Sequence, residues 1–382
     1  MVALLKKVVL FLSAVIFCLT FCNPAFADAQ PQISAKSAIL ISAGNNQVLF
    51  AKDENTKRAM ASTTKIMTAL LTLEAAEKNN RVITITDQMV RVEGSSMGLL
   101  PGNQLTLKAL AEGMLTVSGN DAANSAAIAI GGSIPGFADL MNKRAGELNL
   151  KDTHFVTPSG LDDREHYTTA HDLAILASAA MKNPDFARIV GNRLMNIQFN
   201  SPDQTRRYTN HNKLLVMYKG CEGVKTGFTD QAGRCLVSAA KRNGVSLIAV
   251  TLNASDDWND HIKMLDYGFS SMVSYPIDDS HYAVDLPVTG GADDFVRVCG
   301  TSADSLFLRK PDTENIKRMV QMPHFIYAPV EAGQVVGKVS YELNGRVLAS
   351  TELVTAQSVN RYTLPKNPFQ VFADKIKELL KI

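Results

Sequence analysis

The pattern of apolar and polar positions predicts strands at both ends of the first two thirds of the chain. Between residues 38 and 51, two short apolar runs flank Gly44-Asn45-Asn46, which is typical of antiparallel strands joined by a tight turn. A second hairpin is expected over 235–252, where Asn243-Gly244 readily adopts the positive φ angles of a hairpin turn. We expect these four strands to share one antiparallel sheet.

Helices are predicted between the two hairpins. Five segments carry apolar residues at three- and four-residue spacing, which is typical of helices that pack one face against a core. These segments are 62–76, 106–116, 121–130, 137–148 and 170–181. The first part of the chain is therefore expected to be an α/β domain in which helices pack against an antiparallel sheet.

From about residue 275 the pattern changes to short segments in which apolar and polar residues alternate. Residues 335–343 and 346–354 flank Asn344-Gly345, and Val339 and Tyr341 alternate with polar neighbours. The sequence therefore predicts a second, smaller, all-β domain.

The last segment predicts an amphipathic helix. Residues 368–382 place five apolar side chains on one helical face, with lysines elsewhere: Phe369, Phe372, Ile376, Leu379 and Leu380. Such a helix can lie on a membrane surface or dock on its own domain. We expect peripheral membrane contact, and the docked helix stays open as the alternative.

The first 27 residues are typical of a secretory signal. Lys6 and Lys7 precede an apolar run over 8–22, and the small-residue pattern Ala25-Phe26-Ala27 follows. We expect cleavage after Ala27 and export, because the apolar run is shorter than the roughly 20 residues that a membrane span needs. An uncleaved membrane anchor is the alternative.

Composition and charge exclude several classes of protein. The chain has 382 residues, of which 46% are hydrophobic, so it is long and apolar enough for two globular domains. Lys6 and Lys7 leave with the predicted signal, so the 39 basic residues fall to 37 and equal the 37 acidic ones. A formally neutral chain lacks the positive charge that supplies nucleic-acid affinity, and we expect no nucleic-acid partner.

The cysteines and histidines predict neither a disulfide framework nor a metal site. After Cys18 and Cys22 leave with the signal, an odd number remains, namely Cys221, Cys235 and Cys299. A bridge between Cys221 and Cys235 and three free thiols both stay open. His166 and His171 are five residues apart, which is off one helical face, so we expect structural hydrogen bonds and no metal or cofactor.

Ser62-Thr63-Thr64-Lys65 is a candidate nucleophile and base. The tetrapeptide opens an apolar-periodic segment, so we expect Ser62 in the first turn of a helix and Lys65 one turn later on the same side. A serine hydroxyl needs a base to take its proton, and a lysine can act as that base when desolvation or a neighbouring cation keeps it neutral. A helix N-terminus also stabilises negative charge near the serine.

Two further motifs make the tetrapeptide specific. Ser118-Gly119-Asn120 lies at a break between two predicted helices, where a hydroxyl and an amide can point into one cleft. Lys225-Thr226-Gly227 lies on a predicted strand that enters the late hairpin. Taken singly, a helix cap and an edge-strand lysine would explain them. The ordered triple S-x-x-K, S-x-N and K-T-G is the signature of penicillin-binding proteins and class A β-lactamases.

At this point the sequence resembles the low-molecular-weight penicillin-binding proteins, which are serine-type D-alanyl-D-alanine carboxypeptidases of the peptidase S11 family. Four longer blocks look like the surroundings of that family's motifs: 61–68, 95–99, 158–162 and 168–174. The resemblance implies a β-lactamase/DD-peptidase-like α/β fold, followed by a smaller all-β domain. We expect a signal peptide at 1–27, a catalytic domain at 35–275, a β-rich C-terminal domain at 276–362 and an amphipathic helix at 363–382.

The resemblance also implies catalytic roles, motif by motif. Ser62 would be the acylated nucleophile, Lys65 the general base and Ser118 the proton relay to the leaving amine. The enzyme would remove the terminal D-alanine from peptidoglycan stem peptides through a Ser62 acyl-enzyme, which water then hydrolyses. A β-lactam would imitate D-Ala-D-Ala and stall at that ester. The protein would work in the cell wall or at the outer face of the cytoplasmic membrane.

Substrate-binding roles follow from the same resemblance. Asn120 would orient the substrate, and Lys225 and Thr226 of the K-T-G motif, which Gly227 completes, would meet its terminal carboxylate. The backbone N–H groups of Ser62 and Phe228 would form the oxyanion hole. The Phe228 side chain itself would be incidental.

One departure from the family concerns the terminal carboxylate. In related carboxypeptidases an arginine often lies after the final hairpin strand and helps to bind that carboxylate, whereas residues 254–261 contain no arginine. Arg234 is a candidate substitute, with a surface salt bridge as its expected role. The sequence therefore supports acyl transfer more strongly than it supports exopeptidase specificity, which is a preference for substrates with a free terminal carboxylate.

Three other functions use or mimic the same motifs. A DD-endopeptidase that cuts cross-links differs only on the acyl-acceptor side of the cleft. A class A β-lactamase needs a deacylating glutamate, for which Glu165 is the nearest candidate by position, although its surroundings resemble the carboxypeptidases. A catalytically inactive peptidoglycan-binding protein is disfavoured because the three motifs are intact.

Overall fold

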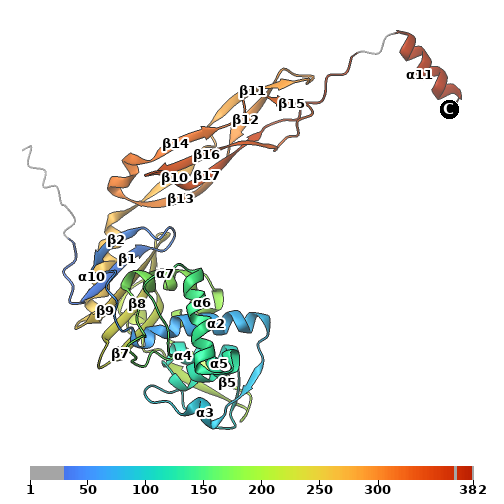
Figure 1. Ribbon diagram of the computed structural model, residues 1–382. Helices are drawn as coiled ribbons and strands as arrows, with labels where there is room; N and C mark the ends of the chain where they lie inside the picture. Colours follow the sequence, from blue (N-terminus) through green and yellow to red (C-terminus); the bar gives the residue numbers. More distant parts are fainter. Residues whose placement is uncertain (1–29, 365–367, 381–382) are drawn as a thin grey trace, which may run out of the picture. The chain divides into compact units, whose positions relative to one another are not determined.

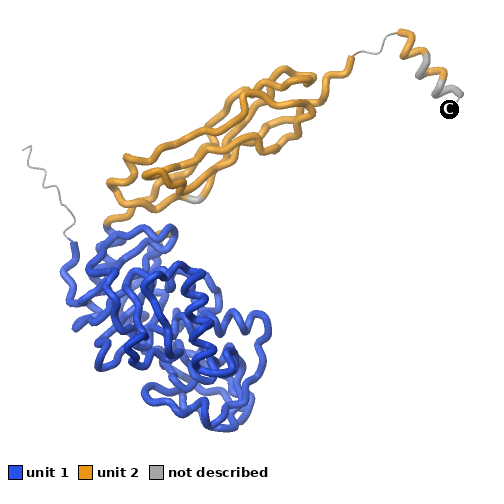
Figure 2. The backbone as a smooth tube through the Cα atoms, viewed as in Figure 1, with its two compact units in different colours: residues 1–242, 246–270 blue, residues 243–245, 271–382 orange. Residues whose placement is uncertain are grey.

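A computed structural model describes residues 30–364 and 368–380. The predicted signal peptide lies outside these residues. The chain divides into two compact units (Figure 2), one with residues up to 242 together with 246–270, and one with 243–245 and the residues from 271 onward. None of the helices within the described ranges is long and apolar enough to cross a membrane.

A five-stranded antiparallel sheet forms the centre of the first unit. Its strands are β1 (Ser37–Ser42), β2 (Val48–Lys52), β7 (Cys221–Thr229), β8 (Gly233–Arg242) and β9 (Val245–Ala254), in the order β2-β1-β9-β8-β7. The prediction that both hairpins share one sheet is confirmed. β1 pairs with β9, so the early hairpin and the late hairpin lie side by side in the sheet, and β2 and β7 are its edge strands.

The five predicted helices are all present. They are α2 (Lys65–Lys78), α4 (Leu107–Thr116), α5 (Asn120–Gly131), α6 (Ile134–Glu147) and α7 (Ala170–Ala180). Together they bury one apolar cluster with the sheet, including Ile66, Leu110 and Phe137. One detail of the prediction is wrong, because Ser62 lies in a 3₁₀ turn, η1 (Ala61–Thr64), and the α-helix begins only at Lys65.

The pattern did not predict helix α10 (Asp257–Ser271), which follows β9 directly (Figure 1). It buries polar residues that mask its periodicity. His261 lies between Ser238 Oγ and Thr251 Oγ1 at 2.6 and 3.0 Å, which ties the helix to β8 and β9. Gly268 lies against Leu247 and Leu40, where an added Cβ would come within 2.6 and 2.8 Å of their side chains.

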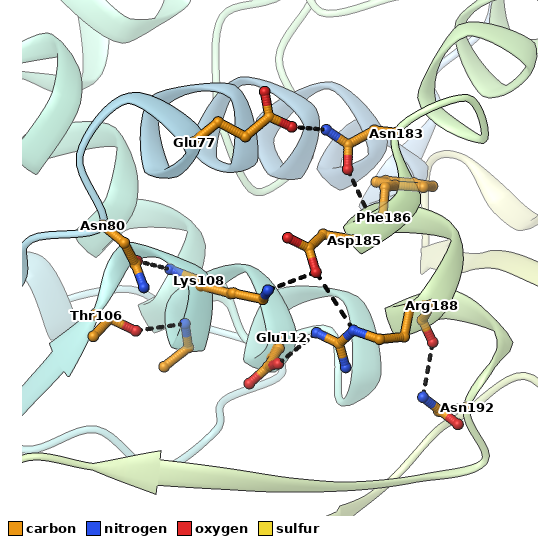
Figure 3. A network of polar contacts seen from close by, with 11 residues as sticks. Glu77, Asn80, Thr106, Lys108, Glu112, Asn183, Asp185, Phe186, Arg188 and Asn192 are labelled. Carbon is orange, nitrogen blue, oxygen red and sulfur yellow. Dashed lines mark hydrogen bonds and ion pairs between the residues drawn. The ribbon is translucent and has the colours of Figure 1, made fainter.

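Helix α8 (Pro184–Gly191) is held by a polar network to α2 and α4 (Figure 3). Asp185 accepts from Lys108, which lowers the pKa of that carboxyl, and Arg188 Nη2 donates to Glu112 Oε1 at 3.0 Å. On its other side α8 packs on β7, since a Cβ on Gly223 would lie 2.6 Å from Val190. The network therefore supports the strand that carries the K-T-G motif.

Smaller elements complete the first unit. They are the hairpin of β3 (Val82–Thr84) and β4 (Gln104–Thr106), the hairpin of β5 (Leu194–Phe199) and β6 (Gln204–Thr209), and the short helices α3 (Asp87–Val90) and α9 (Leu214–Met217).

The second unit is built of strands, as predicted. A six-stranded sheet contains β11 (Ala283–Thr289), β12 (Phe295–Gly300), β14 (Lys317–Gln321), β15 (Ile326–Tyr327), β16 (Val335–Leu343) and β17 (Arg346–Thr355), in the order β14-β16-β17-β12-β11-β15. β10 (Met272–Asp278) pairs with β13 (Ser302–Arg309), and η2 (Lys310–Asn315) follows. The hairpin predicted around Asn344-Gly345 is confirmed.

Helix α11 (Pro368–Leu380) forms in the predicted C-terminal segment. Its apolar residues Phe369, Val371, Phe372 and Ile376 are exposed, with Phe369 at 86%. The side chains of Leu379 and Leu380 lie outside the described part.

Candidate active site

Ser62 and Lys65 are brought together by the 3₁₀ turn. In such a turn residues three apart eclipse one another, and Lys65 Nζ lies 2.9 Å from Ser62 Oγ. The preceding Ala61 has φ +48, a conformation that L-residues rarely adopt. Ser62 is half-buried and lines the cleft, whereas Lys65 is completely buried.

The hydrogen bonds of Lys65 fit a neutral amine. Nζ lies 2.7 Å from Asn120 Oδ1 and 2.6 Å from the Ser159 carbonyl oxygen, which both can only accept. A charged Lys65 donates to all three oxygens; in an uncharged amine the two obligate acceptors take both protons, and the lone pair is left for the Ser62 hydroxyl. Burial, followed by the nearby Lys225, lowers the pKa of Lys65 well below its usual value. The arrangement can therefore remove the Ser62 proton.

Asn120 holds its amide in the orientation that this requires. Its Nδ2 donates to the Glu93 carbonyl oxygen at 2.6 Å, so Oδ1 must face Lys65. The neighbouring Asp121 accepts from the backbone N–H groups of Met97 and Leu99 at 2.9 and 3.0 Å. The loop between α3 and β4 is thereby fixed to the S-x-N motif.

Ser118 and Lys225 form the second pair of the site. Ser118 has φ +61 between α4 and α5, and its hydroxyl lies 3.0 Å from Lys225 Nζ. Lys225 also donates to the Thr226 carbonyl oxygen at 2.8 Å. Burial lowers the pKa of Lys225 to about 7. A proton at this pair can therefore be exchanged near neutral pH.

Strand β7 approaches the turn of Ser62 because Gly227 has no side chain. A Cβ at Gly227 would lie 3.1 Å from the backbone nitrogens of Ser62 and Thr63. Ser62 and Phe228 both line the cavity beside this contact. Phe228 is 63% exposed.

The loop that contains Ser159 and Gly160, for which the sequence predicted no catalytic role, contacts Lys65 and the turn that carries Ser62. Ser159 supplies the carbonyl acceptor of Lys65, and Gly160 has φ +84 with its Cα so close to Ala61 that a Cβ would lie 1.9 Å from the Ala61 oxygen. His166 binds Thr64 Oγ1 at 2.8 Å and accepts from the Val156 N–H at 2.9 Å. The block 158–162 indicated this loop, but no pattern in the sequence showed that a backbone carbonyl would act.

Two cavities meet at Ser62. One cavity of about 440 Å³ is lined by residues of the three motifs, of β8, of the start of α10 and of two loops: Ser62, Ser95, Ser118, His211, Thr226, Gly227, Phe228, Arg234, Asp257 and Trp258. The other, of about 460 Å³, also contains Asn120 and has three acidic residues in its wall, Glu93, Asp162 and Asp230. A substrate can therefore extend to both sides of the nucleophile.

The structure thus brings Ser62, Lys65, Ser118, Asn120 and the K-T-G residues of β7 around one cleft. Glu165 is exposed and is not among the described residues that line either cavity, so no deacylating glutamate of the β-lactamase kind is found at its position.

The three cysteines in the described part of the chain, Cys221, Cys235 and Cys299, are free.

Comparison with known families agrees with this site. Residues 24–256 match the family described as D-alanyl-D-alanine carboxypeptidase, peptidase S11, and residues 276–361 match the C-terminal domain of penicillin-binding protein 5. The curated D-alanyl-D-alanine carboxypeptidase DacF of Bacillus subtilis is 33% identical over 372 residues, which cover 94% of this chain and 95% of DacF.

Solved structures show the same fold. Penicillin-binding protein 5 of Haemophilus influenzae superimposes with a TM-score of 0.66 at 28% identity, over 87% of this chain and 99% of that one. The DD-transpeptidase of Streptomyces K15 matches 63% of this chain and 99% of its own, with a TM-score of 0.60 and 32% identity.

The chain belongs to the peptidase S11 family of D-alanyl-D-alanine carboxypeptidases. It is a serine-type enzyme of cell-wall peptidoglycan, and the family's substrate is a stem peptide that ends in D-Ala-D-Ala. β-Lactam binding is typical of this family. The predicted fold class and enzyme activity are confirmed.

Proposed function

We propose that the carboxypeptidase reaction of this chain proceeds through an ester on Ser62 with Lys65 as the base. The observation that carries the proposal is that Lys65 Nζ contacts two groups that can only accept hydrogen bonds, Asn120 Oδ1 and the Ser159 carbonyl oxygen. These two acceptors leave the lone pair of a neutral amine for the Ser62 proton. Ser62 Oγ attacks the carbonyl of the D-Ala-D-Ala bond as that proton moves to Nζ. The developing oxyanion accepts from the N–H groups of Ser62 and Phe228.

Collapse of the tetrahedral intermediate requires a proton for the leaving amine. Ser118 Oγ, with Lys225 Nζ at 3.0 Å, is the proposed relay. The carbon–nitrogen bond breaks as Ser118 protonates the leaving amine and takes up the proton that Lys65 removed from Ser62, so D-alanine leaves and Lys65 is neutral again. Lys65 then accepts a proton from the water molecule that attacks the ester and returns it to Ser62 Oγ. Thr226 and Gly227 line the cavity in which the leaving residue would sit. A β-lactam would form the same ester, but its leaving group stays attached.

The test is mass measurement of the intact protein after exposure to benzylpenicillin, with D-alanine release from a diacylated D-Ala-D-Ala peptide measured in parallel. We expect an adduct and D-alanine release with the wild type and neither with Ser62→Ala. Ser125→Ala is a matched control, because Ser125 is buried on α5 and its hydroxyl donates to the Asp121 carbonyl oxygen of the same helix. An adduct on Ser62→Ala would refute the assignment of the nucleophile.

The organisation of the chain follows from this function. We propose that residues 1–27 direct export, that 35–275 form the catalytic domain and that 276–362 form the β-rich domain. Residues 363–382 would hold the enzyme at the outer face of the cytoplasmic membrane, because the apolar side chains of α11 are exposed.

The membrane proposal is tested with vesicles. Full-length mature protein should sediment with anionic phospholipid vesicles, and Phe372→Asp should sediment less, because a charge replaces an apolar side chain that is 65% exposed. Tyr362→Asp, outside the helix and 60% exposed, is the control. Equal sedimentation of wild type and Phe372→Asp would contradict membrane contact through α11.

A further inference from the structure

The cavity of about 440 Å³ next to Ser62 contains one permanently charged cation. Among its described lining residues, Arg234 is the only lysine or arginine, and its side chain is 52% exposed. Phe228 of β7 and Arg234 of β8 are direct cross-strand partners, so their side chains leave the sheet on the same face. The guanidinium is therefore accessible from the cleft.

The other basic groups nearby are either hydrogen-bonded to protein groups or uncharged. Lys225 is 2% exposed, donates to Ser118 Oγ and the Thr226 carbonyl, and is not among the described residues that line this cavity. His211 does line it, but burial and Lys225 lower the pKa of its imidazole below the ordinary value, so it is neutral at neutral pH. The positive charge available to a ligand in this cavity therefore rests on Arg234.

Asp257 positions Arg234 through an ion pair but does not use the hydrogen-bond donors of its guanidinium group. Asp257 is the first residue of α10, its side chain is 5% exposed, and its Oδ1 lies 3.6 Å from Arg234 Nη1. That separation is an ion pair and too long for a direct hydrogen bond. The guanidinium thus keeps its planar set of donors for a second carboxylate, which it can bind through two parallel hydrogen bonds. Trp258, the next residue, forms part of the same cavity wall.

The substrate of this family supplies such a carboxylate. The leaving residue of D-Ala-D-Ala carries it on the carbon next to the scissile nitrogen, within one residue of the carbonyl that Ser62 attacks. We propose that Arg234, positioned by Asp257, binds the terminal carboxylate of the leaving residue and makes the enzyme select a free chain end over an amidated or cross-linked one. This inference rests on the proposed Ser62 mechanism and adds its specificity.

Two thioester substrates with the same D-alanyl acyl group test the proposal. One has a leaving thiol that carries a carboxylate, and the other carries the corresponding carboxamide; both are reactive enough to be followed. With Arg234→Gln we expect kcat/KM to fall about 10- to 100-fold for the carboxylate and less than about 3-fold for the carboxamide. Arg234→Lys should recover part of the loss, because it restores charge without the bidentate geometry.

The control is Arg297→Gln, since Arg297 has the same 52% side-chain exposure and also pairs with one aspartate, Asp285, at 3.1 Å. Arg297→Gln should leave kcat/KM unchanged for both thioesters. Asp257→Asn should lower the carboxylate-to-carboxamide ratio about 3- to 10-fold through KM, with unchanged turnover of the carboxamide. If Asp257 had a purely structural role, Asp257→Asn would lower kcat/KM for both substrates by the same factor.

Equal losses for the two thioesters in Arg234→Gln, or no loss for either, would overturn the inference. Failure of the Ser62 mechanism has a different signature, because wild type and Ser62→Ala would then hydrolyse each thioester at the same rate. The two proposals are therefore tested separately in one set of assays.

Discussion

His166 Nε2 lies 2.8 Å from Thr64 Oγ1, and this contact ties the loop behind the site to the turn that carries Ser62. The other ring nitrogen accepts from the backbone N–H groups of Val156 and Thr157 at 2.9 and 3.3 Å. Since Nδ1 accepts, the proton of the neutral ring is on Nε2 and is donated to Thr64. A second proton would break the contact with the Val156 backbone.

The first prediction concerns the pH dependence of stability. Burial lowers the pKa of His166 to about 4, below the value of about 6.5 in an unfolded chain. The unfolded state therefore binds more protons between these values, and the free energy of unfolding falls as pH falls from about 6.5 towards 4. The loss is on the order of 3 kcal/mol.

Urea unfolding of wild type and His166→Gln between pH 7.5 and 4.5 measures this effect. His261 is also buried with a lowered pKa and is present in both proteins, so the difference between the two curves isolates His166. His166→Gln should be less stable at pH 7.5 and less sensitive to acid. Parallel curves for the two proteins would exclude the role of His166.

The second prediction concerns Lys65. An arginine stays charged at any accessible pH and cannot accept the Ser62 proton, so Lys65→Arg should lower the rate of acylation by benzylpenicillin about 1000-fold or more. In the wild type, acylation should rise with pH through a pKa well below the usual lysine value. Stopped-flow or mass measurement of acylation against pH gives both results.

Lys78→Arg is the control for this variant, because Lys78 is exposed at the end of the same helix. Thermal unfolding would show whether Lys65→Arg remains folded. Acylation of a folded Lys65→Arg protein at the wild-type rate would exclude Lys65 as the base.

The third prediction tests the oxyanion hole through Gly227. A Cβ at this residue would lie 3.1 Å from the Ser62 and Thr63 backbone nitrogens and 3.2 Å from the Ala61 Cβ, so Gly227→Ala must shift β7 or the turn by a few tenths of an ångström, which misplaces the donors. Loss of one properly placed donor costs about 100- to 1000-fold in kcat. D-Alanine release should fall by that factor.

Gly146→Ala provides the comparison, because a Cβ at Gly146 would have no heavy atom within 4 Å and the residue lies in α6. It should leave activity unchanged and stabilise the helix by up to about 1 kcal/mol. Activity of Gly227→Ala within 3-fold of wild type would be incompatible with the proposed oxyanion hole.

The fourth prediction concerns Asp121, which joins the loop between α3 and β4 to the S-x-N motif. Its carboxylate accepts from Ser96 Oγ and from the N–H groups of Met97 and Leu99, and it is 2% exposed. Asp121→Asn replaces one acceptor oxygen by a donor and should lower the free energy of unfolding by about 2 kcal/mol or more. Asp139→Asn, at an exposed site on α6, should change it by less than about 0.5 kcal/mol. Equal effects in urea unfolding would show that these bonds do not stabilise the loop.

Much of the fold was determined by local pattern. The turns at Gly44-Asn45-Asn46 and Asn243-Gly244, and the helical periodicity from Ser62 onward, depend on residues close in sequence, so the sequence alone predicted these elements. Helix α10 was not predicted, because it buries polar residues such as Asp257 and His261. Their partners on β8 and β9 come into place only after the sheet has formed.

The sequence by itself also determined the class of chemistry, since Ser62, Lys65, Ser118, Asn120 and Lys225 occur in three ordered motifs. Only the tertiary structure decided how those residues are supported. The Ser159 carbonyl at Lys65, the Glu93 carbonyl at Asn120 and the ion pair of Arg234 with Asp257 join segments between 23 and 94 residues apart. Backbone carbonyls carry no side-chain signature, and contacts over such separations depend on how helices pack on the sheet.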